Sequence, residues 1–283
     1  MSALSTSSLP QADWLLVHEG SSPLICSIPH AGTHIPAPYQ SRFISEWAAL
    51  RDSDWWVDRL YGFARDMDVT LVQTRISRSV IDVNRPADNR SLYPGQASTD
   101  LCPLNNFDGE SLYLPGNTPT GQDIDDRKNN YYQPYHQALQ TQIARLRAHH
   151  PTVVLYDCHS IRSRIPRLFP AQLPLLNIGT YEGRSCSPEL QALIDLQCQH
   201  SGLEYVINGR FKGGAITRHY GRPEQGIHAV QMEIACRAYM QEPDTPLSSL
   251  NWPPAWSLQD AAPLQAVLSS LLQAMQEWAA CQN

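Results

Sequence analysis

The amino-acid sequence predicts an α/β protein built on a mostly parallel or mixed sheet. Short apolar runs rich in β-branched residues alternate along the chain with longer segments whose apolar residues recur at helical spacing. Strands and helices that alternate in this way form a sheet covered by helices on both faces. No repeat, block of like charge or low-complexity tract divides the chain, so we expect residues 1–283 to form a single domain.

Seven short apolar runs are the predicted strands. They span residues 23–28, 69–75, 79–83, 152–157, 175–180, 204–208 and 227–234. Several of them are separated by helical segments, which is the arrangement that parallel pairing requires.

Four helices are predicted, over about residues 52–67, 123–150, 187–200 and 263–280. Asp52 or Ser53 can cap the first helix, and the second is expected to kink or restart near Pro134. The last helix carries an apolar stripe that is expected to pack on the core. Residues 87–122 are rich in Pro, Gly and Asn, which predicts a lid, a binding loop or a disordered segment.

The composition argues against several classes of partner. The chain has 21 basic and 27 acidic residues and a net charge of −6, so no general electrostatic field favours nucleic acid or an anionic membrane surface. The seven cysteines show no CxxC spacing, and the N-terminal segment is polar. No run approaches the roughly 18 apolar residues of a membrane span. These features predict a cytoplasmic protein whose anionic ligands are held by specific side chains.

Two histidines follow apolar runs in matching positions. His30 and His159 each fall just past the end of a predicted strand, where an open α/β sheet forms its ligand crevice. One such histidine is more often a loop residue bonded to the backbone, but two make a metal pair an equal alternative. A catalytic zinc needs a third protein ligand, and the candidates Asp52, Asp54 and Asp58 can instead cap a helix.

Glu233 is unusual because it lies within the apolar run IHAVQMEI. A carboxylate buried there is either a general base or one half of a structural ion pair with an arginine. Cys158 is not expected to act with His159 as nucleophile and base, because neighbouring residues of a strand point to opposite faces. Arg78 is as compatible with a surface charge as with ligand binding. The chain has no GxSxG, HExxH, P-loop or GxGxxG motif.

Seven longer motifs occur in order over about residues 24–240. They are SIPHAGTHIP, DSDWWVDRLY, SRSVIDVNRP, YYQPYHQAL, DCHSIRSRIPRLFPAQLPLLNIGT, FKGGAITRHYG and QMEIACRAYM. Together they resemble the N-formylglutamate amidohydrolase family. That family is similar in fold to zinc-dependent exopeptidases, which implies a three-layer α/β/α protein. The implied activity is metal-dependent hydrolysis of N-formyl-L-glutamate to formate and L-glutamate, in histidine degradation.

The resemblance also implies a role for each candidate residue. The implied ligands of one divalent metal ion, Zn²⁺, are His30, Asp54 and His159. Glu233 is implied as the catalytic acid and base, and Asp157 as a group that orients an imidazole. The residues expected to bind the small anionic substrate are Asn84, Arg85, Arg162, Arg164, Arg218 and His219.

Two other functions are compatible with the sequence. The first is a metal-dependent amidase that acts on another N-acyl amino acid or on a peptidoglycan fragment. The absence of a secretion signal argues against the peptidoglycan substrate. The second, of a different class, is a non-enzymatic ligand-binding protein of the same fold. It is disfavoured because every expected site position is filled.

Overall fold

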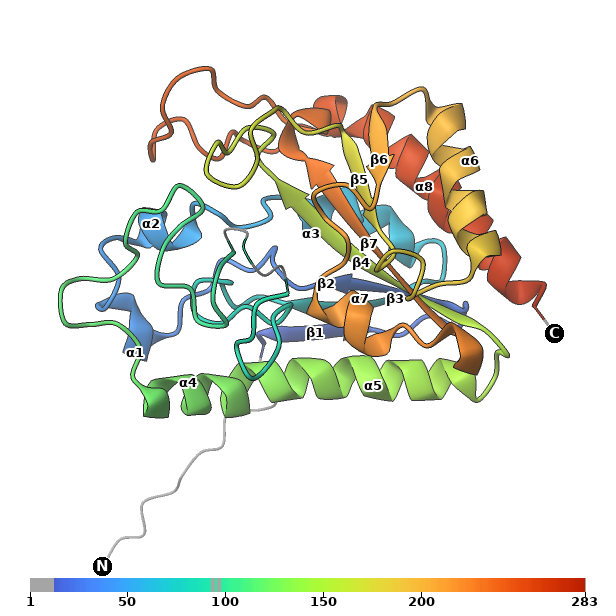
Figure 1. Cartoon of the computed structure of the whole chain (residues 1–283), viewed down its shortest axis with the longest axis horizontal. Coiled ribbons are helices and arrows are strands. Elements are labelled where there is room, and N and C mark those ends of the chain that lie inside the picture. Colours follow the sequence, from blue (N-terminus) through green and yellow to red (C-terminus); the bar gives the residue numbers. More distant parts are fainter. Residues whose placement is uncertain (1–12, 93–94, 96–97, 283) are drawn as a thin grey trace, which may run out of the picture.

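The centre of the structure is a mixed sheet of seven strands (Figure 1). The computed structural model describes residues 13–92, 95 and 98–282. The strands are β1 (Leu15–His18), β2 (Leu24–Ile28), β3 (Thr70–Thr74), β4 (Val153–Ile161), β5 (Leu176–Gly179), β6 (Tyr205–Ile207) and β7 (Ile227–Ala235). Their spatial order is β1-β3-β2-β4-β7-β5-β6. Strands β3, β2, β4 and β7 are parallel, whereas β1 and β5 pair antiparallel with β3 and β7, so the predicted mixed sheet is confirmed.

Helices cover both faces of this sheet (Figure 1). The helices are α1 (Ala37–Gln40), α2 (Glu46–Leu50), α3 (Val57–Leu60), α4 (Gly121–Arg127), α5 (Gln133–Arg147), α6 (Pro188–Ser201), α7 (Ala215–Tyr220) and α8 (Leu258–Ala280). One core cluster joins α6 and α8 to the sheet through residues such as Ile194, Leu268 and Met232. A second cluster joins α5 and α7 to the opposite face through Leu139 and Ile216. The result is the expected arrangement of three layers.

The alternation of side chains explains why the sheet needs both helical layers. In β2, Ile25 belongs to the cluster under α5, and its neighbour Cys26 belongs to the cluster under α8. All residues of β2, β3 and β4 are buried. A parallel sheet covered on both faces accounts for the nearly continuous apolar runs from which these strands were predicted.

The prediction of a strand over residues 79–83 is wrong. This segment forms a turn in which Val80 and Ile81 pack in a third apolar cluster with Ile35. The turn is stabilised by side chains, because Asp82 accepts a hydrogen bond from the backbone N–H of Asn84 at 2.9 Å. Such local bonds compete with the backbone pairing of a strand.

The first predicted helix is also shorter than expected. It begins only at Val57, and the residue before it, Trp56, has a left-handed backbone with φ of 65° and no side-chain cap. Asp52 and Ser53 therefore do not cap this helix. A 3-10 helix over Gly62–Arg65 completes the segment.

The predicted interruption of the long helix is confirmed near Pro134. A π-helical turn over Lys128–Tyr132 separates α4 from α5, and Pro134 lies in the first turn of α5. Proline has no backbone N–H, so it cannot continue the regular hydrogen-bond ladder through this point.

The long segment over residues 87–122 is irregular in its described part up to Gly121, where α4 begins. It contains only isolated bridges there, between Phe43 and Tyr113 and between Asn105 and Ser111. The polar N-terminal segment, residues 1–12, lies outside the described residues. Within the described part of the chain, no helix has both the length and the apolar character to cross a membrane.

His136 of α5 connects this helix to the segment that borders the site described below. Its Nε2–H donates to the carbonyl of Val83 at 2.9 Å, and its Nδ1 lies 2.8 Å from the hydroxyl of Tyr220 in α7. Burial is the main reason that the pKa of His136 falls to about 4.

Acid should therefore destabilise the fold through His136. The unfolded state binds this proton near the ordinary pKa of about 6.5, so the free energy of unfolding should fall by roughly 2–3 kcal/mol as pH drops through this window. His136→Gln should remove that part of the slope when denaturant unfolding is measured at about pH 7.5 and about pH 4.5. An identical slope in both proteins would contradict the assignment.

Candidate active site

Adjacent parallel strands bring polar side chains to one edge of the sheet. His30 lies two residues after β2, and His159 and Glu233 are register partners near the ends of β4 and β7. Because side chains alternate along a strand, Cys158 and Met232 point into the core under α6 and α8. His159 and Glu233 consequently face the opposite side of the sheet, as do Asp157 and Gln231, two residues before them.

The sequence suggested that His159 lies just past the end of its strand, but the structure places this residue within β4. Strand β4 continues to Ile161 because it pairs with β7 from Val153 to Ile161 without a break. The backbone hydrogen bonds of two neighbouring strands therefore fix the position of this imidazole.

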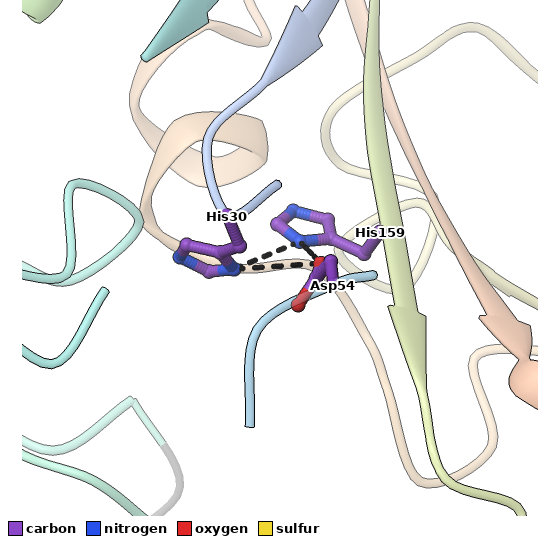
Figure 2. A group of neighbouring side chains, drawn as sticks. All are labelled: His30, Asp54 and His159. Atoms are coloured by element: carbon purple, nitrogen blue, oxygen red, sulfur yellow. Dashed lines mark hydrogen bonds and ion pairs between the residues drawn. The ribbon is translucent and has the colours of Figure 1, made fainter. Parts of the chain in front are cut away.

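Three buried side chains converge at this edge, as Figure 2 shows. The Nδ1 atoms of His30 and His159 are 3.1 Å apart. The Oδ2 atom of Asp54 lies 3.2 Å from Nδ1 of His159 and 3.7 Å from Nδ1 of His30. The backbone N–H of Ser160 donates to the same oxygen at 3.1 Å, and the N–H of Asp54 donates to the carbonyl of His30 at 3.0 Å.

Each imidazole is also hydrogen-bonded to a carboxylate through Nε2, the ring nitrogen that faces away from Asp54. The Nε2–H of His30 donates to Oδ1 of Asp82 at 2.7 Å, and the Nε2–H of His159 donates to Oδ2 of Asp157 at 2.9 Å. A hydrogen bond at one ring nitrogen selects the tautomer and leaves a lone pair on the other. Both Nδ1 lone pairs thus face Oδ2 of Asp54.

This donor set fits a single divalent metal ion. Two lone pairs and a carboxylate oxygen at separations of 3.1–3.7 Å repel one another unless a cation or a proton lies between them. Bonds of about 2.0–2.2 Å in a tetrahedral site require donor separations of about 3.3–3.6 Å, close to those observed. One ligand atom each of His30, Asp54 and His159 lies within 4.8 Å of the others, so the three side chains could hold a metal ion.

The site has a negative electrostatic environment. Burial lowers the pKa of His159, but the carboxylates of Asp157, Asp54 and Glu233 outweigh burial and raise that pKa well above its ordinary value. Burial raises the pKa of Asp54, yet the charges of His30 and Arg78 and the histidine hydrogen bonds outweigh it and lower that pKa. Asp54 therefore stays ionised, and its negative charge beside His159 favours a bound cation.

Glu233 is a buried acid with no arginine or lysine at ion-pair distance among the described residues. Its carboxylate accepts a hydrogen bond from Nε2 of Gln231 at 3.1 Å. Burial, with a further contribution from the charge of Asp54, raises the pKa of Glu233 to about 8. A carboxyl with a pKa near neutrality can both take and release a proton, as a general acid and base must. The alternative of a structural ion pair has no support in this geometry.

The structure separates the two neighbouring aspartates of the DSDWW motif. Asp54 faces the histidines, whereas Asp52 accepts a hydrogen bond from the backbone N–H of Phe107 and pairs with Arg162 at 3.3 Å. Asp52 thus holds the loop that carries Phe107 and makes no contact with the histidine pair.

A cavity of about 80 Å³ opens beside the group formed by His30, Asp54 and His159. His30, His159 and Glu233 line it together with two arginines, Arg85 and Arg210. Its apolar wall is formed by Phe107, Ile161, Leu168 and Phe211. The cavity therefore combines the candidate catalytic groups, cationic side chains and an apolar surface.

Asn84 lines this cavity, but its amide is committed to protein groups. Its Oδ1 accepts a hydrogen bond from the N–H of Ile216 at 2.8 Å, and its Nδ2 donates to Oδ2 of Asp157 at 3.0 Å. Gly214 permits this close packing, because a Cβ atom there would lie 2.5 Å from the amide of Asn84. Asn84 thus orients Asp157 and also lies directly against His159, with 2.8 Å between its Nδ2 and Nε2 of the imidazole.

Four residues expected to bind the substrate lie elsewhere. Arg162 pairs with Asp108 at 2.8 Å as well as with Asp52, and the exposed Arg164 donates to Gln172. Arg218 and His219 line a separate cavity of about 840 Å³ beside α7. Arg162 and Arg164 follow the end of β4, and Arg218 and His219 lie in α7. None of the four lines the first cavity, and their role in substrate binding stays a prediction.

The sequence analysis missed Arg210 and the role of Arg78. Arg78 is 7% exposed and contacts two site carboxylates, so it is not a surface charge. Its place in the motif SRSVIDVNRP, four residues before Asp82, was the available signal. Arg210 precedes FKGG and had no signal of its own.

Comparison with known proteins identifies the family of the chain. A family model described as N-formylglutamate amidohydrolase matches residues 22–240. The N-formylglutamate deformylase of Pseudomonas putida is 42% identical over 267 residues, which are 94% of this chain and 97% of that protein. The protein of the same name from Pseudomonas aeruginosa is 40% identical over 260 residues, or 92% of this chain and 94% of that protein.

A solved structure shares the fold. The crystal structure of N-formylglutamate amidohydrolase from Ralstonia eutropha JMP134 superposes with a TM-score of 0.77 and 22% sequence identity. The match covers 94% of this chain and 98% of that chain. At this identity the likeness concerns the three-layer architecture.

The two aspartates provide a matched test of the metal-binding group. Asp54→Asn should weaken binding of a divalent cation by more than about 100-fold, because a direct ligand should matter more than the partners behind it. Asp52→Asn removes a less buried charge two residues away, which does not face the histidines, and should leave that affinity unchanged. Titration of each purified variant with Co²⁺ against a competing chelator measures the difference. Equal losses in both variants would place the cation elsewhere.

Proposed function

The chain belongs to the N-formylglutamate amidohydrolase family, and we propose that it hydrolyses N-formyl-L-glutamate to formate and L-glutamate with one bound metal ion. It is a hydrolase that acts on a linear amide C–N bond. The observation that carries the proposal is the convergence of two imidazole Nδ1 atoms and one carboxylate oxygen beside Glu233. We also propose a cytoplasmic location, supported by seven cysteines that are all free.

We assign the metal ligands to His30, Asp54 and His159, and the metal to zinc. Two neutral imidazoles, one carboxylate and an open fourth position are the ligand set of many catalytic zinc sites. Bound there, zinc supplies Lewis acidity that polarises the formyl carbonyl and lowers the pKa of the attacking water.

Glu233 carries the protons of the reaction. It takes a proton from the water that attacks the formyl carbon and delivers one to the amine nitrogen as the C–N bond breaks. The raised pKa of its carboxyl, at about 8, suits both transfers. Gln231 holds the carboxylate at 3.1 Å and limits its rotation.

Arg85 and Arg210 are the proposed partners of the two substrate carboxylates. Both line the cavity that contains Glu233 and the histidines. The guanidinium of Arg85 is anchored by Nη2 to Thr99 at 2.9 Å, and Nε of Arg210 donates to the carbonyl of Leu168 at 3.0 Å. These anchors orient the guanidiniums for the charged hydrogen bonds that carboxylates accept. The apolar wall suits the methylene groups between the carboxylates.

The proposed activity is tested by formate release from N-formyl-L-glutamate. Glu233→Gln should retain the bound metal and the fold but lower kcat by about 100-fold or more, the scale expected when a general acid and base is lost. Metal analysis, thermal unfolding and the rate are measured on the same preparation. Exhaustive chelation of the parent protein should abolish formate release, and zinc should restore it.

Two results would contradict this assignment. Full activity after chelation, in protein free of metal by elemental analysis, would exclude a metal-dependent reaction. Full activity in Glu233→Gln would return Glu233 to a structural role.

Substrate recognition is tested by removing each arginine. Arg85→Gln and Arg210→Gln should each lower kcat/KM for N-formylglutamate by roughly 10- to 150-fold, the equivalent of about 1.5–3 kcal/mol for one charged hydrogen bond. An uncharged formamide, which has no carboxylate, should be hydrolysed at an unchanged rate. Arg164→Gln is the control because Arg164 is exposed and does not line the cavity.

The same assay addresses the alternative of an amidase with another N-acyl substrate. Equal rates on N-formyl, N-acetyl and neutral amides, with both cavity variants unaffected, would favour that alternative over a deformylase.

A further inference from the structure

Arg78 connects two carboxylates of the site from a buried position. Its Nη1 donates to Oδ1 of Asp54 at 3.1 Å, and its Nη2 donates to Oδ2 of Asp82 at 2.9 Å. The ring of Phe107 covers the guanidinium, with 4.9 Å between Cζ and the ring centre. Since Asp52 holds the backbone of Phe107, this cover is itself fixed in place.

In both Asp54 and Asp82, the oxygen that does not bind Arg78 faces a histidine of the metal-binding group. Asp54 directs Oδ2 toward the two histidine Nδ1 atoms while Oδ1 is occupied by Arg78. Asp82 accepts the Nε2–H of His30 at Oδ1 while Oδ2 is occupied by Arg78. One guanidinium therefore restricts both an acidic ligand and the partner that orients a histidine ligand.

The buried carboxylates of the site explain why a positively charged side chain is needed between them. Asp54, Asp82 and Asp157 are each no more than 1% exposed, and their repulsion would otherwise separate them. Within the described residues, Arg78 is the arginine that donates hydrogen bonds to two of these carboxylates. Arg85 approaches Asp82 at 3.5 Å but makes no contact with Asp54.

We propose that Arg78 is a positioning residue that sets the metal affinity of this site. It leaves a single oxygen of Asp54 facing the cation, and it holds Asp82 so that Nδ1 of His30 stays aimed at the same point. A planar fork with two donors can hold two carboxylates at once, which the single ammonium of lysine does less well. The inference rests on the proposed function because it takes His30, Asp54 and His159 as the metal ligands.

The test compares Arg78→Gln and Arg78→Lys with the parent protein and with Arg85→Gln. Co²⁺ is the probe, because its visible absorption reports its coordination and its affinity can be measured by chelator competition. Arg78→Gln should weaken Co²⁺ binding by about 10- to 100-fold, the usual effect of losing a group behind a metal ligand, and should alter the Co²⁺ spectrum. Arg78→Lys should give an intermediate loss.

Arg85→Gln is the matched control, since it removes a neighbouring positive charge without freeing Asp54. Because Arg85 approaches Asp82 alone, at 3.5 Å, its loss should lower Co²⁺ affinity far less than Arg78→Gln does, and it should raise KM for N-formylglutamate. Arg78→Gln, saturated with metal, should instead lower kcat with little change in KM. This split distinguishes a group that positions the site from one that binds substrate.

Unchanged Co²⁺ affinity and spectrum in Arg78→Gln would overturn the inference, even if the variant unfolds at a lower temperature. Such a variant would lose stability equally in its metal-free and metal-loaded forms, as a purely structural residue does. If Arg78→Gln does not fold, the affinity of Arg78→Lys decides by the same criterion.

The two proposals can fail separately. A parent protein that binds Co²⁺ but releases no formate contradicts the proposed function, while the comparison of affinities still decides the role of Arg78. A parent protein that binds no divalent cation overturns both.

Discussion

Buried negative charge is the constraint on which the site depends. Asp82, Asp157 and Glu233 lie within the protein interior, where water cannot stabilise a carboxylate. Asp82 and Asp157 are stabilised by hydrogen bonds from Arg78, the histidines and neighbouring polar groups. Glu233 lacks an ion-pair partner among the described residues, and its raised pKa is the response. The neighbouring group of His30, Asp54 and His159 could hold a divalent cation, whose charge would offset this excess of negative charge.

The parallel strands of the sheet make this concentration of polar groups possible. Neighbours β2, β4 and β7 end at the same edge, and their side chains alternate between core and site. Met232 therefore packs under α8 while Glu233, the next residue, faces the cavity. The same strands thus contribute side chains to the apolar core on one face and to the polar site on the other.

The sequence predicted the central strands well, because a sheet covered on both faces needs apolar residues at nearly every position. It misassigned residues 79–83, whose apolar side chains fill a separate cluster around a turn held by Asp82. It also missed β1, an edge strand in which no residue is fully buried, so no apolar run marked it. A local hydrogen bond and packing against distant residues decided the first segment, and pairing with β3 decided the second.

The sequence by itself determined the chemical types available to the site: two histidines near strand ends, a carboxylate within an apolar strand, and the ordered motifs of the family. Only the tertiary structure decided which side chains meet. It turned Asp54 rather than Asp52 toward the histidines, buried Arg78 between two carboxylates, and brought Arg210 to the cavity. The direction of a loop side chain depends on the path of its backbone and on partners from distant segments. Spacing along the chain does not contain that information.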